Sequence, residues 1–331
     1  MRLAVATLLC FACRTVSRDV ARSPNTYMSI FREEQVIFTS SFNITSILVP
    51  VDSSKYMPAG VSDVPSIFFA ISDPRLEGGS CIYVLEGLAA YELLEGGRDS
   101  TADYGAGKAI YFGARDGLYK YDADSLSAKK YGPFDDDILQ LQKGNDTDAI
   151  FILNTERKIY RIEKNGTVKT KIQSIICALE FVLDTSNNIY YIACDDRMPH
   201  IARQDGSYIS YVTTVGDDFK DIKLLRPAFV MEKCIPFFAD GGLYILYANG
   251  TTEKKDFYIR ERPSAYSVDA TLYLVAALDG KIYEFNVMEV LLKSMFGVVS
   301  HWPSDVTKII MSIIETAKDG VYKDWASILD H

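Results

Sequence analysis

A short strand-turn-strand phrase recurs along the chain at a nearly constant interval. In each copy an apolar strand and a polar turn precede an aliphatic residue that tyrosine usually follows, as in AIYFGARDGLYKY at 109–121. A strand-built repeat of roughly 40 residues is typical of a β-propeller, in which each repeat forms one four-stranded blade. The aliphatic position falls at Ile82, Leu118, Ile159, Ile201, Leu243, Ile282 and Val321.

Seven copies favour an all-β fold, a β-propeller of seven four-stranded blades. Six blades with a helical C-terminal cap are the alternative, because residues 286–331 also show helical spacing around a potential N-cap at Ser304. The strand-like segment 35–42 is expected to pair with the last blade and so to close the ring without an open edge. A single propeller domain is predicted over residues 34–325, with a short tail at 326–331.

The N-terminus has the pattern of a secretory signal peptide. Arg2 supplies the positive start, and the apolar run that follows, residues 3–12, is too short to cross a bilayer. Small residues place the cleavage site after Ala12 or after Ser17. The sequence therefore predicts a secreted, extracellular protein, with a signal peptide at 1–17 and an N-terminal segment at 18–33.

Sequons and cysteines agree with export. Four Asn-x-Ser/Thr triplets predict glycosylation at Asn43, Asn145, Asn165 and Asn249. Beyond the signal region the chain has an even number of cysteines, which two disulfides would use in an oxidising compartment. Their spacing is unlike that of a zinc site and leaves three pairings open. These candidates are Cys81, Cys177, Cys194 and Cys234.

The chain carries 44 acidic and 35 basic side chains and has a net charge of -9 with no basic run. This balance argues against a nucleic-acid partner, because phosphates are bound by clustered lysine and arginine. After the signal region no segment of transmembrane length is free of charges, so no membrane partner is expected. With 48% hydrophobic residues the composition is that of an ordinary globular protein, and a monomer is expected.

Four phrases carry a resemblance to a known family: FREEQVIF at 31–38, SIFFAIS at 66–72, IYFGARDGLYKYDADSLSAKKYG at 110–132 and DDDILQL at 135–141. Over most of residues 30–285 the chain resembles the insect ommochrome-binding proteins of moths and butterflies. The resemblance implies a secreted protein of haemolymph or pigmented tissue. Such a protein carries an ommochrome such as xanthommatin, a phenoxazinone pigment made from tryptophan. The resemblance brings no catalytic motif, so the protein is expected not to be an enzyme.

A propeller offers a ligand the mouth of its central channel, built from two kinds of loop: those between blades and those between second and third strands. A phenoxazinone needs flat aromatic surfaces and hydrogen-bonding partners. The predicted mouth loops supply rings for stacking, of which Trp302 is the best candidate, and charged groups for polar and π contacts. Taken singly, each such residue is more often structural. The candidates are Trp302, Phe134, Tyr104, Tyr266, Arg115, Arg197, Arg262, Asp136 and Asp218.

A structural calcium ion on the axis is an open alternative to a protein without cofactors. Acidic residues cluster on the mouth loops, and calcium prefers carboxylate oxygens, although no EF-hand loop is present. The clusters comprise Asp135, Asp136 and Asp137, then Asp195 and Asp196, then Asp217 and Asp218. The alternative function is accordingly a calcium-dependent lactonase or esterase-type propeller hydrolase.

Histidines give little support to other hydrolytic chemistry. The three in the chain, His200, His301 and His331, are not accompanied by a Gly-x-Ser-x-Gly elbow. His200 is expected to cap a turn at the start of a strand. A third interpretation is a protein-binding surface, as in the loosely related yellow and royal-jelly proteins, because fold alone does not decide function.

Overall fold

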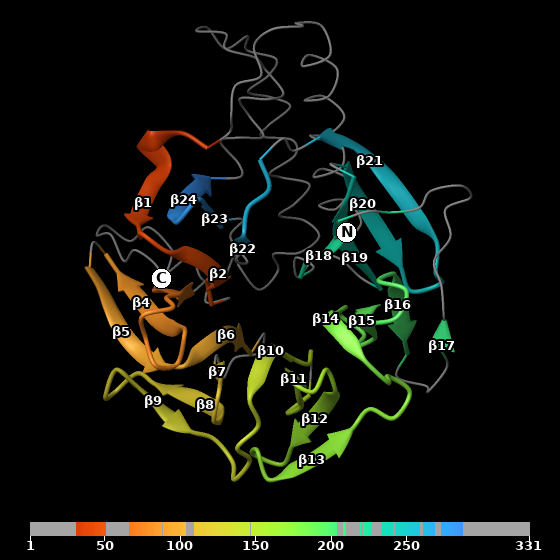
Figure 1. Cartoon of the computed structure of the whole chain (residues 1–331), viewed down its shortest axis with the longest axis horizontal. Helices are drawn as coiled ribbons and strands as arrows, with labels where there is room; N and C mark the ends of the chain where they lie inside the picture. The colour runs from red at the N-terminus through yellow and green to blue at the C-terminus, as the bar shows by residue number, and fades with distance from the viewer. Residues whose placement is uncertain are drawn as a thin grey trace, which may run out of the picture. The chain divides into compact units, whose positions relative to one another are not determined.

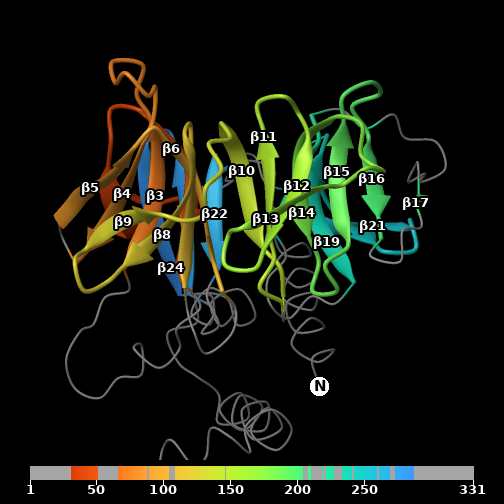
Figure 2. The same ribbon diagram turned by 90° about the horizontal axis from the view of Figure 1, so that it is seen from below.

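Four-stranded antiparallel sheets follow one another along the chain and stand side by side around an axis (Figures 1 and 2). The computed structural model describes residues 31–50, 66–87, 89–103, 109–145, 147–203, 208–209, 219, 221–226, 233–240, 242–258, 261–268 and 273–286. All of them belong to one unit, Thr26–Val287. Within these ranges there are six sheets, each the blade of a β-propeller.

In blades 1 to 5 four consecutive strands run from the axis to the rim. Blades 1 and 2 consist of β2 (Asn43–Leu48), β3 (Ile67–Ser72), β4 (Cys81–Glu86) and β5 (Ala89–Glu95), then β6 (Gly97–Ala102), β7 (Ile110–Ala114), β8 (Gly117–Asp122) and β9 (Ser127–Lys130). Blade 3 consists of β10 (Ile138–Lys143), β11 (Ile150–Asn154), β12 (Ile159–Glu163) and β13 (Val168–Lys171). Blades 4 and 5 consist of β14 (Ala178–Leu183), β15 (Ile189–Ala193), β16 (Pro199–Ala202) and β17 (Tyr208–Ile209), then β18 (Lys223–Leu224), β19 (Cys234–Ala239), β20 (Gly242–Tyr247) and β21 (Thr252–Tyr258).

Blade 6 is built from both ends of the described chain. Its inner strands are β22 (Ala265–Val268), β23 (Tyr273–Leu278) and β24 (Lys281–Asn286), and its outer strand is β1 (Val36–Thr39), which follows a short 3-10 turn, η1 (Glu33–Gln35). β1 pairs antiparallel with β24, with Thr39 opposite Lys281. The expectation that the N-terminal strand closes the ring is confirmed, because β1 completes this blade as a four-stranded sheet.

The preference for seven blades is wrong for the described chain, which forms six. β1 already occupies the outer edge of the blade that contains Ile282, and β22 of this blade lies against β2 of blade 1. The ring is therefore complete without the seventh copy of the repeat. That copy, at Val321, and the alternative helical cap lie outside the described residues, as do the predicted signal peptide and C-terminal tail.

The second strand of a blade is buried along its length, because both of its faces pack against neighbouring sheets. IYFGA of β7, IFILN of β11 and IYYIA of β15 are buried at every position. Such strands appear in the sequence as continuous apolar runs rich in β-branched and aromatic residues. Outer strands such as β9 and β13, with the sequences SAKK and VKTK, have no buried position. The fall in burial from the second strand to the outer strand explains why the apolar runs of the repeat mark the second strands.

Aromatic side chains interlock adjacent blades. Phe68 of blade 1 and Phe112 of blade 2 are both fully buried, with ring centroids 5.6 Å apart. Tyr190 of blade 4 packs in one cluster with Phe237 of blade 5. Burying a side chain of this size contributes roughly 1.5–3 kcal/mol, so apolar contacts across the boundaries between sheets hold neighbouring blades together.

One of the two expected disulfides is present. Cys177, just before β14, is bonded to Cys194, just after β15, with the two Cα atoms 5.5 Å apart. The expectation of a second bridge is wrong, since Cys81 lies on β4 of blade 1 and Cys234 lies on β19 of blade 5, and both are buried thiols. The disulfide therefore links two segments of the same blade, blade 4.

No helix among the described residues has the length and apolar character needed to cross a membrane.

Candidate functional site

A cavity of about 720 Å³ lies on the axis, where the innermost strands begin. Its wall includes residues from β2, β6, β10, β14, β18 and β22, and from the loop between β3 and β4. The volume falls within the range of roughly 300–1,000 Å³ that is usual for small-molecule sites. The cavity is therefore the candidate functional site.

In blades 1 to 4 a β-bulge near the start of the innermost strand turns a polar side chain toward the cavity. In blades 1 to 4 the pairing register shifts immediately before this residue. In blade 5 a lysine takes the same place, directly before the residue whose N–H the previous blade binds. We call these residues the inner polar ring, and all of them line the cavity: Ser46, Asp99, Gln140, Glu180 and Lys223.

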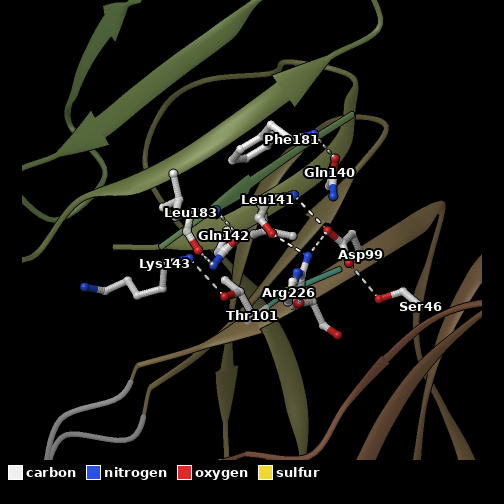
Figure 3. Close-up of polar contacts among 11 residues, drawn as sticks. Ser46, Asp99, Thr101, Gln140, Leu141, Gln142, Lys143, Phe181, Leu183 and Arg226 are labelled. Carbon is white, nitrogen blue, oxygen red and sulfur yellow. Dashed lines mark hydrogen bonds and ion pairs between the residues drawn. The ribbon is translucent and has the colours of Figure 1, made fainter. Parts of the chain in front are cut away.

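Each member of the inner polar ring bonds to the next blade. The Ser46 hydroxyl donates to Asp99 Oδ1 at 2.6 Å, and Asp99 Oδ2 accepts the N–H of Leu141 at 2.9 Å (Figure 3). Gln140 Oε1 accepts the N–H of Phe181 at 3.0 Å. A buried N–H left without a partner costs about 1–3 kcal/mol. The Asp99 and Gln140 side chains therefore supply acceptors for backbone N–H groups of the next blade that would otherwise be unpaired at the cavity wall.

A second layer of the same kind lies deeper on the inner strands. Gln142 Oε1 accepts the N–H of Leu183 at 2.9 Å, and its Nε2 donates to the carbonyl of the same residue at 3.2 Å. Thr101 Oγ1 accepts the N–H of Lys143 at 2.9 Å. Figure 3 shows both layers together. They fix the position of neighbouring blades and so the shape of the cavity.

Arg226 joins opposite sides of the ring. It follows β18 in blade 5, while its guanidinium contacts blades 2 and 3 (Figure 3). Nη2 donates to Asp99 Oδ2 at 2.6 Å and to the Leu141 carbonyl at 2.7 Å, and Nη1 donates to the Ser100 carbonyl at 2.7 Å. Such charge-assisted bonds are roughly twice as strong as neutral ones. The Arg226 side chain thus bridges blades 2 and 5 along the cavity wall.

Glu180 and Lys223 carry opposite charges in the cavity wall, but no direct ion pair joins these two described side chains. We call them the open pair. Glu180 Oε1 accepts the N–H of Leu224 at 2.7 Å, and Lys223 Nζ donates to the Ser264 carbonyl at 2.7 Å. Burial raises the pKa of the Glu180 carboxyl, against the lowering effects of the Leu224 N–H and of the Lys223 charge. Burial also lowers the pKa of the Lys223 ammonium, against the raising effect of Glu180. Both charges are therefore poorly solvated.

Of the predicted ligand-binding residues that the structure describes, two line the cavity. The Tyr266 hydroxyl, on β22, donates to the Arg226 carbonyl, which fixes the ring at the wall. Arg115, in the turn between β7 and β8, donates from Nη1 to the Glu77 carbonyl at 2.9 Å and lies at the exposed rim. The structure brings these two to one site from different blades.

The predicted residues Phe134 and Asp136 do not line this cavity. Phe134 packs on the cluster between blades 2 and 3. Lys169 Nζ lies 5.6 Å from the centre of the Phe134 ring and 2.6 Å from Asp136 Oδ2. Both residues thus contribute to a contact between blades.

Arg197 and Arg262 also lie away from the cavity wall. Arg197 is exposed in the turn between β15 and β16, in a left-handed conformation with φ of 58°. Arg262 Nη1 donates to the Asp221 carbonyl at 2.9 Å and so ties blade 6 to blade 5. The remaining candidates, Tyr104, Asp218 and Trp302, lie outside the described residues.

The described carboxylates of the predicted calcium clusters have partners within the protein. Asp196 Oδ2 lies 2.8 Å from the His200 ring, and Asp195 Oδ1 accepts the N–H of Asp196. Over the described ranges no three His, Cys, Asp or Glu side chains come together as metal ligands would. The other carboxylates are each matched by a cation: Asp135 by Lys130 at 2.8 Å, Asp136 by Lys169 at 2.6 Å, and Asp137 by Arg98 at 2.6 Å.

The predicted glycosylation sites differ in their surroundings. Asn43, Asn165 and Asn249 are exposed. Asn145 is half-buried, and its Nδ2 donates to the Thr185 carbonyl at 3.0 Å. Asn145, Asn165 and Asn249 lie on turns after first or third strands, which alternation places at the end opposite the β3–β4 loop. Glycans there would leave the cavity open, and glycosylation stays a prediction.

Comparisons with known proteins find solved structures of similar fold and no family. No protein-family model matches the chain, and a search of curated proteins finds no match. Similar solved structures include a gluconolactonase from Xanthomonas campestris, with TM-score 0.51, 11% identity, and coverage of 75% of this chain and 87% of that one. A protein of unknown function from Bacteroides thetaiotaomicron gives TM-score 0.51, 10% identity, and coverage of 75% and 70%. A streptogramin B lyase gives TM-score 0.45, 16% identity, and coverage of 68% and 77%.

The two likenesses with a TM-score of 0.51 concern the fold alone, because the identities are only 10% and 11%.

Sequence reasoning missed the inner polar ring and Arg226. Three members of the ring stand third in their strands, as in GRDSTA, ILQLQK and ALEFVL. A polar residue at the same place in successive inner strands is a usable signal, because a buried polar side chain needs a specific partner. Arg226 has no such signal, since the groups that it binds belong to blades far from it in the sequence.

Proposed function

We propose that the chain binds a small organic molecule in the axial cavity and carries it without chemical conversion. The observation that carries this proposal is the cavity of about 720 Å³ with convergent polar groups on its wall. Side-chain bonds between blades hold that wall in place, so the site is formed before the ligand arrives. A preformed site binds more tightly because it loses less conformational freedom on binding.

An ommochrome such as xanthommatin is the proposed ligand. The family resemblance of the sequence supports this choice, and the Tyr266 ring on the wall offers one stacking surface. Arg115 at the rim offers a cation for acidic or π contacts. The proposal includes secretion into haemolymph or pigmented tissue, where a carrier would keep the pigment soluble.

A second candidate function is hydrolysis of a lactone or ester. The likeness to a gluconolactonase favours it, and that likeness supports a hydrolase more than it supports a pigment carrier. Burial raises the pKa of Glu180 on the cavity wall above its ordinary value, which is the direction expected of a carboxyl group that takes and returns a proton in catalysis. A calcium-dependent reaction is less well supported, since Asp99 is bound by Arg226 and Ser46.

Titration with xanthommatin, beside an assay of gluconolactone hydrolysis with and without EDTA, separates the two functions. The carrier is expected to bind the pigment with a measurable heat and a shifted visible absorption band, and to leave the lactone intact. Lactone hydrolysis above the uncatalysed rate, without pigment binding, would replace the carrier by the hydrolase. Loss of hydrolysis in EDTA would add a metal to that hydrolase.

A matched pair of variants tests whether the ligand binds in the axial cavity. Leu139→Trp puts a large ring into the cavity wall, whereas Leu126→Trp puts the same ring on an exposed turn between β8 and β9. Pigment binding should be weakened at least about tenfold by the first change and unaltered by the second. Equal binding by both variants would show that the ligand sits elsewhere.

A further inference from the structure

The cavity wall contains two pairs of opposite charge that differ in how they are satisfied. Asp99 and Arg226 form a direct ion pair at 2.6 Å, and further donors and acceptors surround it. Glu180 and Lys223 interact electrostatically across the boundary of blades 4 and 5, yet no ion pair joins these two described side chains. The first pair is closed, and the second is open to the cavity.

The open pair has unused bonding capacity at the cavity wall. Only Oε1 of Glu180 is used by a described residue, the N–H of Leu224. Lys223 uses one of the three donors of its ammonium group, on the Ser264 carbonyl. Both residues line the cavity, so the unused oxygen and the unused donors are available to a molecule bound there.

Desolvation makes this open pair unfavourable without a ligand. Burial shifts the pKa of each group toward its neutral form, which means that the surrounding protein does not fully replace the lost water. A bound cation beside Glu180 and a bound anion beside Lys223 would supply the missing partners. A ligand that carries both charges a few bonds apart meets both needs at once.

We propose that Glu180 and Lys223 recognise a zwitterionic α-amino-acid group, with its ammonium on Glu180 and its carboxylate on Lys223. This inference rests on the proposed function, because it needs the axial cavity to be a ligand site. The proposed assignment adds the chemical class of the ligand. A molecule with one charge satisfies one partner, and a neutral molecule satisfies neither, so both bind less tightly.

Three probes that share an indole ring test the assignment: L-tryptophan, tryptamine, which lacks the carboxylate, and indole-3-propionate, which lacks the ammonium. Calorimetric titration should give at least about tenfold tighter binding for L-tryptophan than for either of the others, as expected when a bond to a charged group is lost. Equal affinities for the three, or no binding of L-tryptophan, would overturn the proposal.

Two variants test the residues. Glu180→Gln keeps an acceptor for the Leu224 N–H, just as Gln140 serves Phe181 in the blade before. It should weaken L-tryptophan and tryptamine at least about tenfold and leave indole-3-propionate unchanged. Lys223→Gln should weaken L-tryptophan and indole-3-propionate and leave tryptamine unchanged. An equal loss for all probes would mean a general change of the cavity and would overturn the assignment.

Xanthommatin separates the failure of this inference from the failure of the proposed function. If the pigment binds the wild-type protein, is rejected by Leu139→Trp, and binds Glu180→Gln and Lys223→Gln normally, the cavity is the site and the zwitterion assignment is wrong. If no probe and no pigment binds the wild-type protein, both proposals fail. Thermal unfolding of each variant, with a midpoint near that of the wild type, confirms that the comparison is made on folded protein.

Discussion

The guanidinium of Arg226 lies 2.6 Å from the carboxylate of Asp99, although the two residues belong to blades on opposite sides of the ring. The same carboxylate binds the Ser46 hydroxyl and the Leu141 N–H. One side chain of blade 2 is thus connected to blades 1, 3 and 5. The cavity wall is shaped by this contact.

Removing the cation should therefore destabilise the fold. Arg226→Leu leaves Asp99, which is 6% exposed, without its charged partner, and such a loss costs about 3 kcal/mol. The free energy of unfolding in urea measures it. Arg161→Leu, which breaks the exposed pair with Glu163, is the control and should cost less than about 1 kcal/mol. Equal effects of the two variants would contradict a structural role for the Asp99–Arg226 contact.

The Tyr266 side chain should act through its ring in binding and through its hydroxyl in stability. Tyr266→Phe removes the hydrogen bond to the Arg226 carbonyl and should cost about 1 kcal/mol of unfolding free energy, with xanthommatin affinity retained. Tyr266→Ala should also weaken xanthommatin binding, by several-fold, because it removes the stacking surface. Calorimetry that finds the pigment bound equally by both variants would exclude Tyr266 as a platform.

The Glu180 carboxyl should make stability depend on pH. Its pKa is raised in the folded state, so the folded protein holds the proton more tightly than the unfolded chain does. As pH rises above the ordinary value of 4.5, stability is lost until the folded pKa is passed. Urea unfolding of wild type and Glu180→Gln across this range should show the wild type losing stability relative to the variant. A constant difference would contradict the raised pKa.

The Cys177–Cys194 disulfide should be a substantial source of stability. It joins residues 17 positions apart, and a loop of about that size corresponds to about 3 kcal/mol. Cys177→Ser combined with Cys194→Ser should lower the unfolding free energy by about this amount. A loss below about 1 kcal/mol would show that the loop is already ordered in the unfolded chain.

The Cys81 thiol should be unreactive in the native protein. Burial is the main cause that raises its pKa to about 12, so almost no thiolate is present at neutral pH. Peptide mapping after iodoacetamide treatment should find it unmodified without denaturant and modified in urea. Rapid native modification would mean that β4 opens readily.

Much of the fold follows from the sequence, because each blade repeats the same local pattern. The buried second strands give the apolar runs, and the polar turns that follow them mark the period of the repeat. The blade number did not follow, since the repeat counts hairpins while a closed ring depends on where Val36–Thr39 pairs. The sequence predicted that this strand closes the ring, but no local pattern records that it joins the blade that contains Ile282.

The site was predictable only in part, for a similar reason. Tyr266 and Arg115 were found because mouth loops can be located from strand order. Asp99 and Glu180 were missed, because the bulge that turns them inward changes the alternation by one residue. Phe134 shows the opposite error, since a ring on a mouth loop packs into the core when a neighbouring strand offers a cluster.

A crystal structure of the protein with xanthommatin is the most direct test of the central claim. We expect density for the pigment in the axial cavity, in contact with Tyr266 and with its amino-acid group between Glu180 and Lys223. Pigment bound on the outer surface with the cavity empty, or in the cavity with no contact to these residues, would contradict it.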